Sequence, residues 1–156
     1  MAALSLDEVL TDYALLILNF DLPSFSIDLI KKAKIILCAD GGINHFHKLI
    51  QKYPRDIMDI QCVSPYAVVG DFDSISQDII KFYEKCGTII HKDENQDTND
   101  LEKLLHFINT QSSDPLSNVS SIHNIIIIGA LGGRFDHEMA NISAVVACSL
   151  DQKMFL

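Results

Sequence analysis

The sequence predicts an α/β domain with an open, mostly parallel sheet and helices on both faces, the three-layer arrangement of Rossmann-like folds. Short aliphatic and β-branched runs alternate along the 156 residues with segments of helical periodicity. The strand candidates are apolar along their whole length, as in parallel strands buried on both faces, and lack the strict alternation of a half-exposed antiparallel sheet. The length suits a single domain, which we expect to occupy residues 1–156.

The expected strands cover residues 14–18, 34–39, 66–69, 88–91 and 124–128, and the last residues, 153–156, look like the start of another. The expected helices lie near 27–32 and at 44–49, 77–86, 98–109 and 136–149. Helical periodicity is clearest over 98–109, where leucine and isoleucine recur about every 3.6 residues. Two segments are expected to be irregular: 51–65, which contains two prolines, and 110–121, which is rich in Ser, Asn, Asp and Pro.

The composition limits the classes of partner. A formal net charge of −9 argues against nucleic acid or an anionic membrane, because both bind clusters of Lys and Arg. An acidic protein can still bind a phosphate when metal ions bridge the like charges. The N-terminus lacks the pattern of a signal peptide, and the cysteines form no C-x-x-C pair, so we expect reduced thiols in a cytoplasmic protein.

Polar clusters follow the ends of all five predicted strands, and this is the informative feature of the sequence. They are Asn19, Asp40-Gly41-Gly42, Asp71 with Asp73, residues 96–100 and residues 132–137. In an open parallel α/β sheet, ligands bind in the crevice at the carboxyl ends of the strands. The clusters are therefore expected to converge in space.

The segment Gly-Asp-Phe-Asp-Ser at 70–74 is a candidate metal site. Carboxylates at i and i+2 of an extended segment point the same way, about 6.5–7 Å apart. Magnesium binds one or two carboxylates, several waters and phosphate oxygens, and Gly70 would let the backbone approach a ligand. Alternatively, Asp71 caps a turn and Asp73 or Ser74 caps the following helix.

Asp97 and Asp100 stand at the start of the helix predicted over 98–109. Both could simply favour the helix dipole, with Asp97 as the N-cap. Lys103 follows Asp100 by about one turn, so a carboxylate and an ammonium could share the edge of the crevice. Lys103 could instead belong to an ordinary surface ion pair.

The glycine pairs are candidate phosphate-approach loops. Gly132-Gly133 precedes a helix, where backbone N–H groups can face an anion, and Arg134 could clamp a phosphate in a bidentate manner. Alternatively, this is a tight turn with Asp136 as the N-cap. Gly41-Gly42 could similarly approach a nucleotide or form a flexible turn. The sequence contains no P-loop, no G-x-G-x-x-G and no G-x-S-x-G elbow.

Taken in order, four of these pieces resemble thiamine pyrophosphokinase. They are Ala39-Asp40-Gly41-Gly42 with Asn44, Gly70 to Ser74, Gln96-Asp97 to Asp100 with Lys103, and Gly132-Gly133-Arg134-Phe135-Asp136. The resemblance extends over about residues 14–150. It implies a magnesium-dependent transfer of a pyrophosphoryl group from ATP to the hydroxyl of thiamine, giving thiamine diphosphate and AMP.

The resemblance also implies roles for particular residues. Catalysis and Mg²⁺ binding would fall to Asp71, Asp73 and Asp100. ATP and its phosphates would be bound around Asp40, Gly41, Gly42, Asn44, Gln96, Asp97, Lys103, Arg134 and Asp136. Such a reaction requires mainly positioning and charge neutralisation, so no covalent nucleophile is needed.

Beyond this domain, the resemblance implies a C-terminal β-sandwich domain and a homodimer that binds thiamine between subunits. Because the chain ends before such a domain, we expect a truncated catalytic domain that binds Mg·ATP weakly and does not turn over thiamine. Asn99 stands where the family usually has Thr, which puts one side-chain contact in doubt. Two alternatives remain: a metal-dependent phosphatase with an aspartyl nucleophile within 71–73, and a nucleotide-binding module without catalysis.

Overall fold

The computed structural model describes residues 10–53, 63–112, 119, 122, 124–148 and 153–156. Its core is a six-stranded sheet in the order β4-β3-β2-β1-β5-β6, in which every neighbouring pair is parallel. The strands are β1 (Tyr13–Ile17), β2 (Ile35–Ala39), β3 (Ala67–Gly70), β4 (Ile89–Lys92), β5 (Asn124–Ile128) and β6 (Lys153–Phe155). The predicted open parallel sheet is confirmed, including a strand near the last residues.

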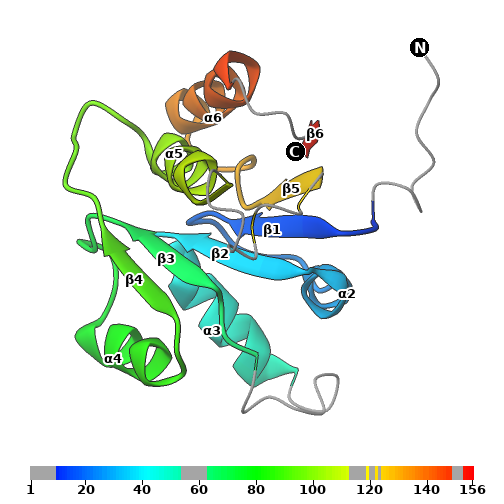
Figure 1. The fold of residues 1–156 in the computed structure, drawn as a ribbon, viewed down its shortest axis with the longest axis vertical. Coiled ribbons are helices and arrows are strands. Elements are labelled where there is room, and N and C mark those ends of the chain that lie inside the picture. Colours follow the sequence, from blue (N-terminus) through cyan, green and yellow to red (C-terminus); the bar gives the residue numbers. More distant parts are fainter. Residues whose placement is uncertain (1–9, 54–62, 113–118, 120–121, 123, 149–152) are drawn as a thin grey trace.

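The helices cover both faces of this sheet (Figure 1). They are α2 (Ser26–Lys32), α3 (Gly42–Lys52), α4 (Gln77–Lys85), α5 (Asp100–Ser112) and α6 (Phe135–Ala147). Successive strand residues point to opposite faces, so Leu16 and Leu37 pack with α5 and α6, whereas Leu15 and Cys38 pack with α2, α3 and α4. This burial on both sides explains why β1, β2 and β3 are apolar throughout. The edge strand β4 is mostly exposed and ends in His91 and Lys92, so the expectation of an apolar strand there is wrong.

Most helix boundaries differ from the prediction by one to three residues. Helix α3 begins at Gly42, directly after the turn that ends β2, and continues to Lys52, into the segment expected to be irregular from 51. Only glycine fits at Gly42, because a Cβ there would be 2.3 Å from the carbonyl oxygen of Ile17. Helix α5 continues to Ser112, so the loop expected from 110 begins later. Helix α6 ends at Ala147, and the predicted last residue of that helix lies outside the described residues, as does most of the segment expected to be irregular over 51–65.

Strand β1 lies in the middle of the sheet, and the order in which strands are added changes sides at β1. From β1 the chain moves outward through β2, β3 and β4 and then returns to the other side of β1 as β5. The reversal between β1 and β5 is the topological switch point, where open α/β sheets form a crevice for ligands. None of the helices in the described part of the chain has the length and apolar character needed to cross a membrane.

Candidate active site

A cavity of about 720 Å³ opens at the carboxyl ends of the strands. Residues from all the predicted strand-end clusters contribute to its lining: Leu18, Asn19 and Phe20 after β1; Asp40 after β2; Asp71, Asp73 and Ser74 after β3; Gln96, Thr98, Asn99, Asp100 and Lys103 around the start of α5; and Gly129, Ala130, Gly133, Arg134, His137, Glu138, Ala140 and Asn141 from the end of β5 and α6. The expected convergence of these clusters is therefore present in the structure.

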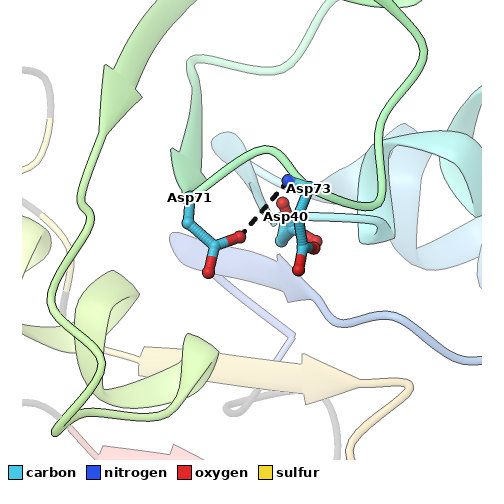
Figure 2. A group of neighbouring side chains, drawn as sticks. All are labelled: Asp40, Asp71 and Asp73. Atoms are coloured by element: carbon cyan, nitrogen blue, oxygen red, sulfur yellow. Dashed lines mark hydrogen bonds between the residues drawn. The ribbon is translucent and has the colours of Figure 1, made fainter.

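Three carboxylates meet at one wall of this cavity. Asp40, Asp71 and Asp73 each present an oxygen within 4.8 Å of the others (Figure 2). Asp40 is buried, Asp71 is partly buried and Asp73 is exposed, so the group reaches from the protein interior to the cavity opening. The sequence predicted Asp71 and Asp73 as metal ligands together with Asp100, but it gave Asp40 a place among the nucleotide contacts instead.

Gly70 is what brings Asp40 and Asp71 together. A Cβ at Gly70 would lie only 2.8 Å from the Cβ of Asp40. Any larger residue at the end of β3 would therefore push the loop after β3 away from Asp40. The close approach that Gly70 allows in this structure is that of β3 to the end of β2.

The backbone between Asp71 and Asp73 is turned, so the prediction of an extended segment is wrong. Phe72 has a φ of +68°, and its N–H donates to Oδ1 of Asp40 at 2.9 Å. The N–H of Asp73 donates to Oδ1 of Asp71 at 3.3 Å. The two carboxylates thus converge through a turn held by Asp40, and their oxygens lie closer than the spacing of an extended strand would give.

The alternative for this loop is correct in one part, because Asp71 caps the turn through the N–H of Asp73, and wrong in the other, because neither Asp73 nor Ser74 caps the following helix. Helix α4 is capped by Ser76, whose Oγ accepts a hydrogen bond from the N–H of Ile79 at 3.4 Å. Ser74 instead donates its hydroxyl to Oδ1 of Asp73 at 2.8 Å. Asp73 and Ser74 are therefore free of a capping role and face the cavity.

At the start of α5, the cap is Asn99 rather than Asp97. Oδ1 of Asn99 accepts from the N–H of Glu102 at 2.9 Å, and the Glu102 carboxylate accepts from the N–H of Asn99 at 2.7 Å. This reciprocal pair is a capping box. Asn99 also donates to the carbonyl of Ala140 on α6 at 3.4 Å. Asp97 is exposed, and the cavity lining found among the described residues does not include it.

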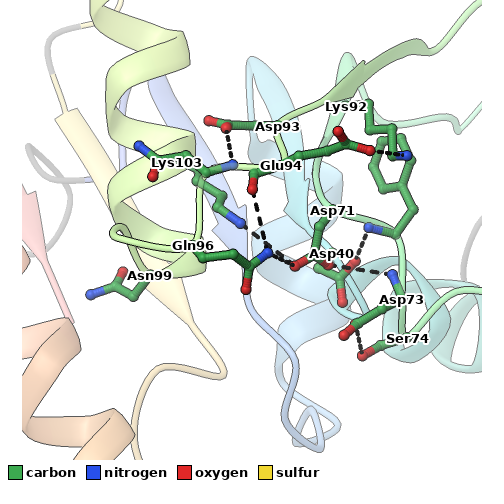
Figure 3. A network of polar contacts seen from close by, with 12 residues as sticks. Asp40, Asp71, Asp73, Ser74, Lys92, Asp93, Glu94, Gln96, Asn99 and Lys103 are labelled. Atoms are coloured by element: carbon green, nitrogen blue, oxygen red, sulfur yellow. Dashed lines mark hydrogen bonds and ion pairs between the residues drawn. The ribbon is translucent and has the colours of Figure 1, made fainter.

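The capped helix positions Lys103 inside the cavity wall, which excludes the surface-pair alternative. The side chain of Lys103 is 3% exposed, and its Nζ lies 3.7 Å from Oδ2 of Asp71. Nε2 of Gln96 donates to the same carboxylate oxygen at 3.4 Å (Figure 3). The predicted residues Gln96, Asp71 and Lys103 therefore form one network.

The environment shifts the pKa values of Asp71 and Asp100 in opposite directions. Burial raises the pKa of Asp71, but the Asp73 N–H, Gln96 and the charge of Lys103 together outweigh it, so the pKa is lowered overall. The pKa of Asp100 is raised, first by burial and then by repulsion from Asp40, which the charge of Lys103 only partly offsets. The carboxylates therefore carry more negative charge than Lys103 neutralises, an environment suited to a cation.

The loop after β5 is shaped by contacts with the end of β1. Gly129 has a φ of +73°, and a Cβ there would lie 2.7 Å from the carbonyl oxygen of Leu18. The N–H of Gly132 donates to the carboxylate of Glu138. The Glu138 carboxylate therefore accepts the hydrogen bond from an N–H group that we expected to face a phosphate.

Arg134 and Asp136 pair with each other at the exposed rim. Nε of Arg134 donates to Oδ1 of Asp136 at 3.0 Å, and Nη2 donates to Oδ2. The guanidinium lowers the pKa of Asp136 through these hydrogen bonds. Helix α6 begins at Phe135, so Asp136 lies inside its first turn, and the prediction of Asp136 as the N-cap is wrong.

Gly41, Gly42 and Asn44 support the site from behind. A Cβ at Gly41 would lie 2.5 Å from the amide of Asn19, so the glycine pair allows the ends of β1 and β2 to pack together. Nδ2 of Asn44 donates to the carbonyl of Ser74 at 2.8 Å and ties α3 to the loop after β3. These residues hold the loops that carry the carboxylates.

The lining residues that were missed from the sequence include Phe20 after β1 and two polar residues of α6, Glu138 and Asn141. Asn141 is buried and donates to the carbonyl of Ala130 at 2.9 Å, which fixes α6 to the loop after β5. Both polar residues follow Arg134 at the spacing that keeps side chains on one helix face. Polar residues at this spacing in the predicted helix could have been recognised from the sequence.

Fold and site together define a parallel α/β domain with a carboxylate-lined cavity in the crevice where such sheets carry their ligand sites. The family profile described as Thiamin pyrophosphokinase, catalytic domain, matches residues 27–156. The chain therefore belongs to the thiamin pyrophosphokinase catalytic-domain family. This confirms the resemblance expected from the four sequence motifs.

Curated relatives and solved structures agree with this family. Thiamine pyrophosphokinase 2 of Arabidopsis thaliana is 40% identical over 139 residues, which cover 86% of this chain and 51% of that protein. Thiamine pyrophosphokinase 3 of Oryza sativa subsp. japonica is 40% identical, over 85% of this chain and 50% of that protein. The thiamin pyrophosphokinase structure from Candida albicans superposes with a TM-score of 0.70 at 28% identity, over 87% of this chain and 53% of that one. The chain thus spans about half the length of the relatives it matches.

Proposed function

We propose that residues 1–156 form the catalytic domain of an enzyme that transfers a pyrophosphoryl group from ATP to the hydroxyl of thiamine, giving thiamine diphosphate and AMP. The observation that carries this proposal is the group of Asp40, Asp71 and Asp73 beside the buried Lys103, in one strand-end cavity of a chain from this family. Carboxylates and a lysine at a single crevice suit a metal-complexed polyphosphate better than a neutral ligand.

Magnesium is the proposed metal, because the available donors fit it. The three carboxylate oxygens within 4.8 Å are hard ligands, and Mg²⁺ commonly takes one or two carboxylates with the rest of its shell from water and phosphate. We assign Asp71 and Asp73 as direct ligands, with Asp40 beside them. Asp100, the first residue of α5, lines the same cavity and is proposed as a further ligand. A bound Mg²⁺ would neutralise charge on the transferring phosphate groups.

The remaining side chains position the polyphosphate. Lys103 is fixed by burial and by Asp71, so its ammonium is a stationary point charge for a phosphate oxygen. Arg134 stands exposed at the rim, where it can exchange Asp136 for a phosphate in the same bidentate geometry. Gln96 holds the Asp71 carboxylate in place. Asp97 stays a proposed nucleotide contact at the outer edge of this region.

For the whole protein we propose a cytoplasmic homodimer that acts on the small molecules thiamine and ATP. The dimer and the substrates follow from the family. Free thiols at Cys38, Cys86 and Cys148 support a reducing compartment. Neither nucleic acid nor a membrane is a proposed partner, given the net charge of −9.

Nucleotide binding by the purified chain tests the proposal. Isothermal titration with a non-hydrolysable ATP analogue should show binding that requires Mg²⁺ and is lost in Asp73→Asn. The matched control is Asp78→Asn, which removes an exposed carboxylate in the first turn of α4. In the whole protein, AMP release should depend on thiamine. Metal-independent binding, or a trapped aspartyl-phosphate intermediate, would contradict the proposed reaction.

A further inference from the structure

Phe20 presents an aromatic ring to the same cavity that holds the carboxylates. It follows β1, lines the cavity and is 37% exposed. Its backbone N–H donates to the carbonyl of Leu18 at 2.9 Å, so the residue is held at the strand end. An exposed aromatic surface in a cavity that also holds charged groups is typical of a place where a ligand buries its own apolar part.

The Phe20 ring lies beside Gly132 and Gly133. A Cβ at Gly132 would lie 2.9 Å from Cε1 and 3.6 Å from Cδ1 of the ring. A Cβ at Gly133 would lie 3.5 Å from Cδ2 and 3.6 Å from Cε2. The two glycines thus lie near opposite edges of the ring, and a side chain at Gly132 would displace it. The exposed part of the ring is the surface that it offers to the cavity.

The position of Phe20 selects which part of a ligand would reach this face. Phe20 and the loop after β5 flank the topological switch point, and Arg134 follows Gly133 directly. The carboxylate group lies at the ends of β2 and β3 instead. A polyphosphate held between Mg²⁺ at the carboxylates and Arg134 at the rim would leave its nucleoside at the Phe20 end.

We propose that the exposed part of the Phe20 ring is the stacking surface for the base of the bound nucleotide, so that Phe20 positions ATP in the cavity. This inference rests on the proposed function. Stacking on an aromatic side chain accepts any purine or pyrimidine, because every base has a flat π-face. Phe20 should therefore strengthen the binding of any nucleotide base and discriminate little between different bases.

Two ligands separate the base from the phosphates: the Mg²⁺ complex of a non-hydrolysable ATP analogue, and Mg²⁺ with inorganic tripolyphosphate. Both are titrated calorimetrically into the wild-type chain and into Phe20→Ala, Phe20→Leu and Phe20→Tyr. Phe20→Ala should lower the affinity for the nucleotide about 5- to 150-fold and leave the affinity for tripolyphosphate within about twofold of wild type. Phe20→Leu keeps apolar volume without a ring and should resemble the alanine variant, whereas Phe20→Tyr should bind like wild type.

The outcomes distinguish this inference from the proposed function. Equal losses for both ligands, unchanged nucleotide affinity in Phe20→Ala and Phe20→Leu, or full binding by Phe20→Leu would overturn the stacking role while leaving nucleotide binding intact. A variant whose change is confined to the KM for thiamine in the whole protein would assign the ring to the other substrate and also overturn it. Wild-type protein that binds neither ligand would refute the proposed function, and the inference with it.

Discussion

Replacing Asn99 with alanine tests whether the capping box at α5 supports both stability and the site. The substitution removes the hydrogen bond from the N–H of Glu102 to Oδ1 of Asn99 and the longer bond from Asn99 to Ala140. The bond from the N–H of Asn99 to Glu102 can persist. The change therefore removes the cap from the first turn of α5 and one link between α5 and α6.

Loss of an N-cap of this kind costs about 1 kcal/mol, within a range of about 0.5–2 kcal/mol. For a domain of this size, about 1 kcal/mol corresponds to a fall in Tm of roughly 2–4 °C. Asp100 is the first residue of α5, and Lys103 follows in the next turn, so fraying of this turn displaces both. Asn99→Ala should therefore also weaken Mg²⁺-dependent nucleotide binding.

Thermal unfolding followed by circular dichroism in EDTA gives the stability change without metal linkage. Asn99→Ser is the matched control, since serine caps as well as asparagine but cannot reach Ala140. We expect Asn99→Ser to retain most of the wild-type Tm. A Tm for Asn99→Ala within about 0.5 °C of wild type, or an equal fall in Asn99→Ser, would refute the assignment of the stability to the cap.

Four further results are expected. Asp73→Asn should remove Mg²⁺-dependent nucleotide binding and shift Tm by no more than about 1–2 °C, because its side chain is exposed; unfolding would make it structural. Asp100→Asn should raise Tm in EDTA, because burial and repulsion from neighbouring carboxylates raise its pKa and penalise the charged form; a lower Tm would contradict this. Gly70→Ala should abolish nucleotide binding through its 2.8 Å Cβ clash, whereas Gly87→Ala, at an open site with φ +89°, should lose stability alone. Burial lowers the pKa of His47, so as the pH falls the unfolded chain takes up this proton before the folded protein does. The free energy of unfolding, measured with urea, should therefore fall as the pH drops below about 6.5. His47→Gln should make this fall smaller.

Much of the fold and the location of the site followed from local pattern. The apolar strands, the helical periodicity around Leu104 and the polar residues at strand ends each depend on a few neighbouring residues. Asp40 could not be placed beside Asp71 in this way, because that contact depends on the pairing of Ala39 with Val69 in adjacent strands. Register between strands is a tertiary property that a short window of sequence does not contain.

Other differences were of two kinds. The turn at Phe72 could not be read from its sequence, because a bulky residue rarely adopts positive φ and does so here with its N–H bound to Asp40. The cap at Asn99 was readable, since Asn99 and Glu102 have the spacing of a capping box. Asp97 was considered first only because it is also a good capping residue. The choice between Asp97 and Asn99 as the cap became clear only once the helix was known to begin at Asp100.

The central position of β1 has a consequence for how the chain folds as it is synthesised. Its partner on one side, β2, follows almost at once, but β5 emerges only after β2, β3 and β4 have been made. Until then, the most buried strand of the sheet has a row of unpaired amide and carbonyl groups along one edge, which is a template for wrong association. The nascent chain therefore depends on the arrival of residues 124–128, and weakened β5 sequences should appear first as aggregation rather than as lost activity.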